Sequence, residues 1–213
     1  EKSTTRLGER DDDGNLTEEA IDRVIETLKR FKEYCISYRV SKILAAATSA
    51  VRESPNGRDL IKRVRENIGI TIELISGAEE ARLIYLGVLS GMSLGNESHI
   101  ICDIGGGSTE LILANSKDTR ALTSSRIGAV RLKNDFFQDE PLTNSRLDFI
   151  KTFIQGSLEP SIGKIKRRLD KNESISMIAT SGTAIALGNL ISSDLGEPKQ
   201  KMHGYKFDKS NLE

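Results

Sequence analysis

The sequence has 213 residues, which is enough for one large domain or two modest ones. Its 31 basic and 31 acidic residues give a formal net charge of zero, so no global field attracts DNA or an anionic membrane. With 37% hydrophobic and 29% charged residues and no apolar run long enough for a signal peptide or a membrane span, the composition excludes disordered and membrane proteins. We therefore expect a globular, cytoplasmic protein that binds any anion through local groups.

The first part of the chain alternates helices and strands. Helical periodicity begins at Thr17, an N-cap residue, and predicts a helix to about residue 38. The apolar run 40–47 predicts a buried strand. A second helix is expected around residues 60–69, a strand over 70–75 and a third helix over 78–89.

The second part begins a new pattern, which places a domain boundary in the loop 90–97 and divides the chain into residues 1–95 and 96–213. The expected elements are strands over 99–103, 108–114 and 121–126, helices over 129–137 and 145–169, a strand over 175–180, a turn at 181–183 and a helix over 184–191. Meandering strands followed by alternating helices and strands indicate a mixed α/β fold.

A glycine-rich motif joins the first two strands of the second part. It consists of Asp103, Gly105, Gly106, Gly107, Ser108, Thr109 and Glu110. Glycines have no Cβ, so the backbone N–H groups can converge on a phosphate while the two hydroxyls add donors. The two acids are of the type that holds Mg²⁺. An extended apolar segment follows the glycines, so a hairpin is expected and a dinucleotide-binding loop is disfavoured. The alternative is an ordinary glycine hairpin flanked by surface acids.

Two further motifs follow strands in the first part. Glu79 and Glu80 open the predicted helix 78–89, where acids can simply favour the helix dipole or where one of them can be a general base for water. Arg82, on the same helix, can reach a phosphate. Arg52 also follows a predicted strand, at the end of a sheet where α/β proteins present ligand contacts, although surface arginines are common in such loops.

A fourth motif, formed by Ser181, Gly182 and Thr183, lies at another junction between a strand and a helix. The N–H groups exposed there can receive an anion or a nucleotide, which makes these residues candidate substrate contacts. Simple capping of the helix explains the two hydroxyls equally well.

Taken together, five ordered motifs resemble the exopolyphosphatase / guanosine pentaphosphate phosphohydrolase (Ppx/GppA) family. They are TSAVR (48–52), ISGAEEARLIY (75–85), DIGGGSTEL (103–111), GAVRL (128–132) and TSGT (180–183). The resemblance implies an actin-like ATPase (ribonuclease H-like) fold with two similar domains around a cleft. The family's first phosphate-loop hairpin has no counterpart here, so the first domain is expected to be truncated at its N-terminus.

The resemblance also implies a role for each motif residue. Glu80 matches the catalytic glutamate that activates water, and Asp103 and Glu110 match acids associated with Mg²⁺ or another divalent cation. Arg52 and Arg82 match arginines near the phosphates, and residues 105–109 match the second phosphate loop. The implied partners are polyphosphate or guanosine penta- and tetraphosphate, with no DNA or membrane, in a protein that is commonly a homodimer.

The leading hypothesis is a phosphoanhydride hydrolase that releases terminal orthophosphate from polyphosphate, pppGpp or both. One alternative is a non-catalytic module that binds polyphosphate or the alarmone through the same loop. Another is a sugar kinase-like ATPase of the same superfamily. The sequence does not separate polyphosphate from pppGpp, because both present a terminal phosphoanhydride.

Overall fold

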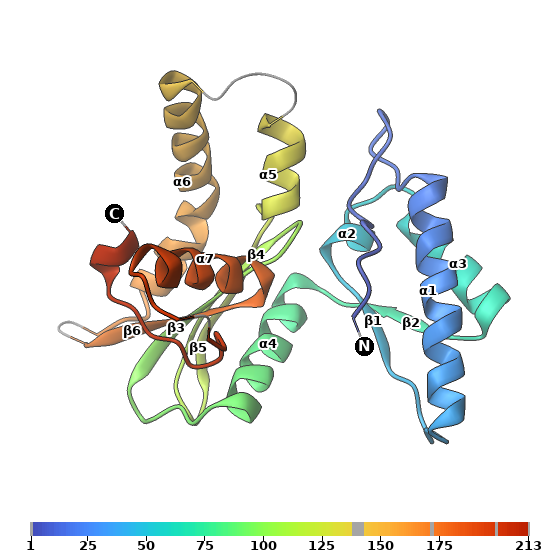
Figure 1. The fold of residues 1–213 in the computed structure, drawn as a ribbon, viewed down its shortest axis with the longest axis horizontal. Helices are drawn as coiled ribbons and strands as arrows, with labels where there is room; N and C mark the ends of the chain where they lie inside the picture. The colour runs from blue at the N-terminus through green and yellow to red at the C-terminus, as the bar shows by residue number, and fades with distance from the viewer. Residues whose placement is uncertain (1, 138–142, 171–172, 199, 213) are drawn as a thin grey trace. The chain divides into compact units, whose positions relative to one another are not determined.

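A computed structural model describes residues 2–137, 143–170, 173–198 and 200–212, and the chain forms two compact units (Figure 1). The units are Glu1–Gly77 and Ala78–Glu213. The sequence places the domain boundary some twenty residues later, at residue 95. The two divisions differ in helix α4 (Gly77–Gly91), because its Ala81, Tyr85 and Val88 pack into a core of the second unit. The assignment of residues 1–95 to a first actin-like domain stays a prediction.

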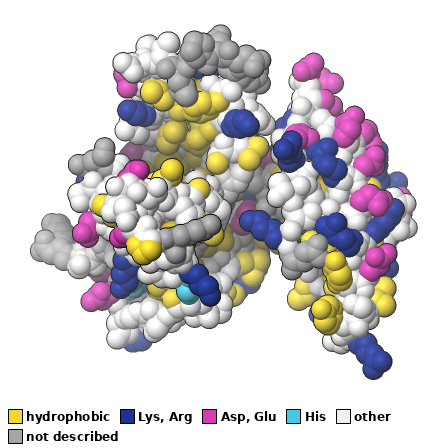
Figure 2. Space-filling view, in the orientation of Figure 1, with side chains coloured by type: hydrophobic (Ala, Val, Ile, Leu, Met, Phe, Trp, Pro, Cys, Tyr) yellow, Lys and Arg dark blue, Asp and Glu magenta, His cyan; other side chains and the backbone are white. Residues whose placement is uncertain are grey.

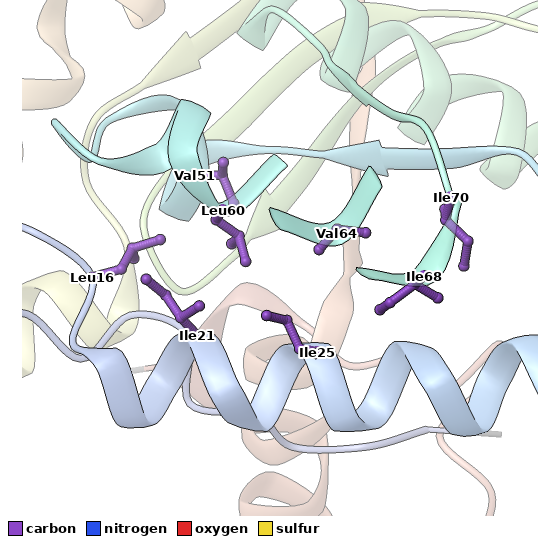
Figure 3. Close-up of a cluster of buried hydrophobic side chains, with 8 residues drawn as sticks. All are labelled: Leu16, Ile21, Ile25, Val51, Leu60, Val64, Ile68 and Ile70. Atoms are coloured by element: carbon purple, nitrogen blue, oxygen red, sulfur yellow. The ribbon is translucent and has the colours of Figure 1, made fainter. Parts of the chain in front are cut away.

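The first unit packs helices against a small parallel sheet. Its elements are α1 (Glu18–Ser37), β1 (Ala45–Ala47), α2 (Ser49–Arg52), α3 (Gly57–Ile68) and β2 (Ile72–Leu74), and β1 pairs with β2. Figure 3 shows apolar side chains of α1 and α3 pointing toward one another, with Leu60 and Val64 of α3 facing Ile21 and Ile25 of α1. The helix predicted over 17–38 is confirmed, with Thr17 as its N-cap accepting from the N–H of Ala20.

The strand predicted over 40–47 is shorter and less buried than expected. Only Ala45–Ala47 is a strand, and Val40 and Leu44 before it are 48% and 82% exposed. In the described chain this sheet has two strands, so β1 pairs on one side only. An apolar run predicts burial only where neighbouring elements cover it.

The second unit is built on a four-stranded sheet. Its strands are β3 (Ser98–Ile104), β4 (Thr109–Ala114), β5 (Thr119–Ser125) and β6 (Ile175–Thr180), in the order β5-β4-β3-β6. β3 and β4 pair antiparallel and β3 and β6 pair parallel. The helices after α4 are α5 (Ala129–Phe136), α6 (Asn144–Lys166) and α7 (Ser181–Asp194), and a 3₁₀ helix covers Lys209–Leu212. The predicted hairpin around residues 105–107 is confirmed.

Helices cover both faces of this sheet. Ile101 and Ile112 pack with residues of α4, whereas Leu111 and Leu113 pack with Ile165 of α6. Successive residues of a strand point to opposite faces, so α4 and α6 lie on opposite sides. All six residues of β4 are consequently buried. In Figure 2, hydrophobic side chains also gather on the surface that α5 and α6 form. None of the described helices is long and apolar enough to span a membrane.

The segment 181–183 is not a separate turn before the last predicted helix. Ser181, Gly182 and Thr183 form the first turn of α7, which begins directly after β6. The residue at the junction, Ser181, takes up the change of direction with a φ of 77°. A hydroxyl-glycine-hydroxyl sequence is typical of both a turn and a helix start, which explains the error.

Candidate functional site

Four polar residues form one row across the sheet of the second unit. Ser124 on β5 is paired with Glu110 on β4, Glu110 with Asp103 on β3, and Asp103 with Thr180 on β6. The row closes with hydrogen bonds at both ends, because Ser124 donates to Glu110 at 2.7 Å and Thr180 donates to Oδ2 of Asp103 at 2.5 Å. Paired residues of neighbouring strands point to the same face. The two acids predicted from the glycine motif are therefore held side by side.

Glu110 is the most buried acid of the row, with only 1% of its surface exposed. The pKa of its carboxyl group is raised to about 7, mainly because the group is buried. The negative charges of Glu80 and Asp103 contribute to the rise, and hydrogen bonds from Ser124 and Ser108 oppose it. The protein alone does not neutralise the negative charge of a carboxylate in this position, so the group favours binding a cation or a proton.

Glu80 of helix α4 is close enough to the row to influence the charge of Glu110. The side chain of Glu110 lies on the same face of the sheet as that of Ile112, and Ile112 packs against α4. The negative charge of Glu80 on that helix contributes to the raised pKa of Glu110. Glu80 lies in the first turn of α4 and is half-buried. The structure thus brings the predicted base and the two predicted metal ligands into one electrostatic cluster.

The neighbouring Glu79 and Arg82 pair with each other. The guanidinium group of Arg82 donates to both carboxylate oxygens of Glu79, at 2.7 and 2.6 Å, on the exposed side of α4. Arg82 thus pairs with Glu79, the glutamate three residues before it on α4. The role of Arg82 at a phosphate stays a prediction.

The glycine loop lies directly beyond the row and joins β3 to β4. The N–H of Gly105 donates to the carbonyl of Ser108 at 3.0 Å, which closes the hairpin. The hydroxyl of Thr109 donates to the carbonyl of Ile127 at 2.6 Å, so its side chain supports the loop. Within the described residues, the N–H groups of Gly106 and Gly107 have no acceptor. Two adjacent backbone donors next to two acids are suited to a phosphate that arrives with a cation.

The first turn of α7 is attached to the base of the same loop. The hydroxyls of Ser181 and Thr183 donate to the carbonyl of Ile104 at 2.8 and 2.9 Å. Both side chains therefore hold the end of β3, and Gly182 between them is exposed. Their role as substrate contacts stays a prediction.

Arg52 belongs to the first unit, at the end of α2. Its guanidinium group donates to the carbonyl of Ile75 at 2.9 Å, so it links α2 to the segment after β2. Its expected contact with phosphate stays a prediction.

Asp103 and Glu110 fit a divalent cation that also binds a phosphate. In the described part of the chain, no group of three or more His, Cys, Asp and Glu side chains could hold a metal ion. Mg²⁺ is nevertheless often bound through one or two carboxylates together with water and substrate phosphate oxygens. The adjacent position of the two acids and the raised pKa of Glu110 agree with that mode of binding.

Sequence reasoning missed the residues that support these acids. Ser124 and Thr180 become visible only through strand pairing, because they lie 14 and 77 residues from the acids to which they donate. Gly128 and Arg131 lie in a motif that carried the family resemblance, but the spacing assigned no role to either. Both contact the glycine loop in the structure.

Comparison with known proteins gives consistent matches. A model of the Ppx/GppA phosphatase family matches residues 1–209. The chain is 33% identical over 165 residues to exopolyphosphatase 1 of Mycobacterium tuberculosis, covering 76% of this chain and 47% of that protein. It is also 33% identical over 147 residues to guanosine-5′-triphosphate,3′-diphosphate pyrophosphatase of Photobacterium profundum, covering 69% of this chain and 29% of that protein. The chain thus spans about half or less of these curated relatives.

Solved structures show the same relationship. An exopolyphosphatase from Cytophaga hutchinsonii superposes with a TM-score of 0.78 at 31% identity, over 88% of this chain and 59% of that chain. A Ppx/GppA family member from Aquifex aeolicus has a TM-score of 0.68 at 26% identity, over 98% of this chain and 62% of that chain. These likenesses confirm the predicted α/β fold class, which the chain shares with Ppx/GppA phosphatases.

Proposed function

Because the chain belongs to the Ppx/GppA phosphatase family, we propose that the full-length protein hydrolyses the terminal phosphoanhydride bond of inorganic polyphosphate or pppGpp and releases orthophosphate. The observation that carries the proposal is the pairing of Asp103 with Glu110 immediately beside the glycine loop, where the charge of Glu80 on α4 also acts on Glu110. Curated relatives named for each of the two activities match this chain, which supports both substrates.

The terminal phosphate binds to the glycine loop. The N–H groups of Gly106 and Gly107 supply donors to its oxygens, while the side chain of Ser108 hydrogen-bonds to Glu110. Arg82 contributes positive charge, and it leaves its exposed pairing with Glu79 to do so. Phosphoryl transfer needs mainly positioning and charge neutralisation, which these groups provide without covalent chemistry.

Asp103 and Glu110 would hold a divalent cation, which we propose to be Mg²⁺. Such a cation would supply positive charge to the phosphate oxygens. The hydroxyl of Thr180 fixes the direction in which Asp103 presents its carboxylate, and Ser124 does the same for Glu110. A divalent cation next to Glu110 would favour the ionised form of its carboxyl group, because the cation offsets the free-energy cost of burying a negative charge.

Glu80 acts as the general base. It accepts a proton from a water molecule whose oxygen attacks the terminal phosphorus in line with the bridging oxygen. The bond between phosphorus and the bridging oxygen breaks, and its electron pair stays on the shortened chain or on the nucleotide diphosphate end. Orthophosphate leaves with the oxygen of the water, so atoms and charges balance.

The experiment measures phosphate release by the full-length protein with Mg²⁺ and either substrate, for the wild type, Glu80→Gln and Glu159→Gln. Glu159 is an exposed glutamate of α6 in the same unit, which makes it a matched control. We expect Glu80→Gln to lower kcat by at least about a hundredfold and the control to leave it unchanged. Unchanged turnover in Glu80→Gln would refute the base. Tight substrate binding by the wild type without turnover under any divalent cation would instead support a binding module.

A further inference from the structure

The start of helix α5 is bound to the glycine loop. The N–H of Ala129 donates to the carbonyl of Gly105 at 3.0 Å, and the N–H groups of Val130 and Arg131 both donate to the carbonyl of Gly106, at 2.9 and 3.0 Å. The first N–H groups of a helix have no partner within the helix and need acceptors elsewhere. Here the loop carbonyls are those acceptors, so the loop and the helix start form one unit.

A third carbonyl of the loop is held by a side chain of the same helix. Nε of Arg131 donates to the carbonyl of Gly107 at 3.2 Å. In a trans peptide the C=O of one residue and the N–H of the next point in opposite directions. Fixing the carbonyls of residues 105, 106 and 107 toward α5 therefore directs the N–H groups of Gly106, Gly107 and Ser108 away from it. Three successive N–H groups with a common direction form an anion-binding nest.

Gly128, the residue before α5, permits this close approach. A Cβ at this position would lie 2.5 Å from the carbonyl oxygen of Gly106, 2.6 Å from its carbonyl carbon and 2.7 Å from the nitrogen of Gly107. All three are backbone atoms of the loop, which cannot move aside as the end of a side chain can. The φ of Gly128 is −151°, so the need for glycine comes from space and not from the backbone conformation.

We propose that Gly128 and Arg131 are positioning residues that orient the glycine loop for phosphate. The inference rests on the proposed function, because it assigns these residues to the same phosphate site. Neither residue needs to touch the substrate. Gly128 sets how closely the helix approaches the loop, and Arg131 holds the last loop carbonyl, so that the loop donors are already aimed before phosphate arrives.

The first test compares Gly128→Ala with Gly156→Ala. Gly156 lies within α6, and a Cβ there would meet nothing within 4 Å, so this variant is a matched control for the same chemical change. The full-length protein is titrated with tripolyphosphate, and the backbone amide signals of Gly106 and Gly107 are followed by NMR well below the unfolding midpoint. We expect Gly128→Ala to raise Kd by at least about tenfold and to shift both amides before ligand is added, whereas the control does neither. Wild-type affinity and amide positions in folded Gly128→Ala would overturn the proposal.

The second test covers the case in which Gly128→Ala does not fold. Arg131→Met removes the donor to Gly107 and keeps a side chain of similar length, and Arg131→Lys retains a donor. We expect Kd for tripolyphosphate to rise about fivefold in the methionine variant and to recover in part with lysine, without loss of folded protein. A residue with a merely structural role would leave the Kd of the folded protein unchanged, and that result for Arg131→Met would contradict its role. Binding is measured without turnover, so a wild type that binds but releases no phosphate would refute the proposed hydrolase and leave this inference standing.

Discussion

The hydroxyl of Ser124 donates a hydrogen bond of 2.7 Å to Oε1 of Glu110, a carboxyl group that is almost completely buried. The two residues are directly paired on β5 and β4. A hydrogen bond from Ser124 favours the charged form of the carboxyl group, whereas burial and the nearby acids Glu80 and Asp103 favour the protonated form. Burial is the larger effect, and the pKa of Glu110 rises to about 7.

This raised pKa predicts a pH-dependent stability in the metal-free protein. The native state keeps the proton on Glu110 up to a pKa of about 7, whereas the unfolded state releases it near 4.5, the ordinary pKa of a glutamate side chain in water. The contribution of Glu110 to the free energy of unfolding should therefore be fully present below pH 4.5 and be lost as the pH rises to about 7, by on the order of 3 kcal/mol. Urea unfolding across this pH range in the presence of EDTA measures the effect.

Glu110→Gln is the control for that measurement, because glutamine has the same shape and no charge. The difference in stability between the wild type and Glu110→Gln should change between pH 4.5 and about 7 and level off above that range. Added Mg²⁺ should reduce the loss of stability in the wild type only, since it favours the ionised carboxylate. Parallel pH profiles for the two proteins without metal would contradict the raised pKa.

The hairpin around the glycine loop could be predicted from the sequence because its signal is local. Three glycines followed by an extended apolar segment fit a strand, a turn and a strand, and β3 and β4 pair accordingly. The acids at its two ends are fixed by the same pairing, since a hairpin places Asp103 opposite Glu110 once its turn is known. Local spacing therefore sufficed for two members of the row.

The remaining features depend on contacts between distant segments. The burial of Glu110 follows from helices on both faces of the sheet, and a strand that is buried on both faces shows no alternation in its sequence. Gly128 lies directly before the helix predicted over 129–137, and only its contact with the backbone of Gly106 and Gly107 explains the absence of a side chain. Val40 and Leu44 show the opposite error. Their apolar side chains predicted a buried strand, but in the described structure both residues are exposed.

Because the ion pair between Arg82 and Glu79 is exposed, a substitution of Arg82 should affect activity without affecting stability. Arg82→Met should leave the free energy of unfolding nearly unchanged, because an exposed ion pair contributes little. If Arg82 moves to the phosphate in the substrate complex, kcat/KM for phosphate release should fall by about tenfold to a hundredfold. Steady-state kinetics of the full-length protein beside its urea unfolding curve gives both values. Equal kcat/KM in the wild type and Arg82→Met would remove Arg82 from the phosphate site.

The separate cores of the two units predict local effects of core substitutions. Leu60 is 1% exposed in the core of the first unit, so Leu60→Ala should cost about 2–5 kcal/mol there. Ile112 is fully buried in a core of the second unit. Hydrogen exchange should show reduced protection in α1 and α3 for Leu60→Ala and in β3 and β4 for Ile112→Ala. Equal loss of protection throughout the chain for either variant would show that the units unfold together.

A substitution of Thr180 tests how strongly metal binding depends on the hydrogen bond that orients Asp103. Its hydroxyl donates to Oδ2 of Asp103 at 2.5 Å, and Thr180→Val removes the donor while keeping the size and β-branching of the side chain. Partners that orient a metal-binding carboxylate typically account for about tenfold to a hundredfold in metal affinity. We therefore expect Thr180→Val to need about tenfold more Mg²⁺ for half-maximal phosphate release, with less change at saturating Mg²⁺. Thr183→Val is a suitable comparison, because that hydroxyl donates to the carbonyl of Ile104 and not to an acid. An unchanged Mg²⁺ requirement in Thr180→Val would indicate that Asp103 is oriented without this hydroxyl, or that it does not hold the metal.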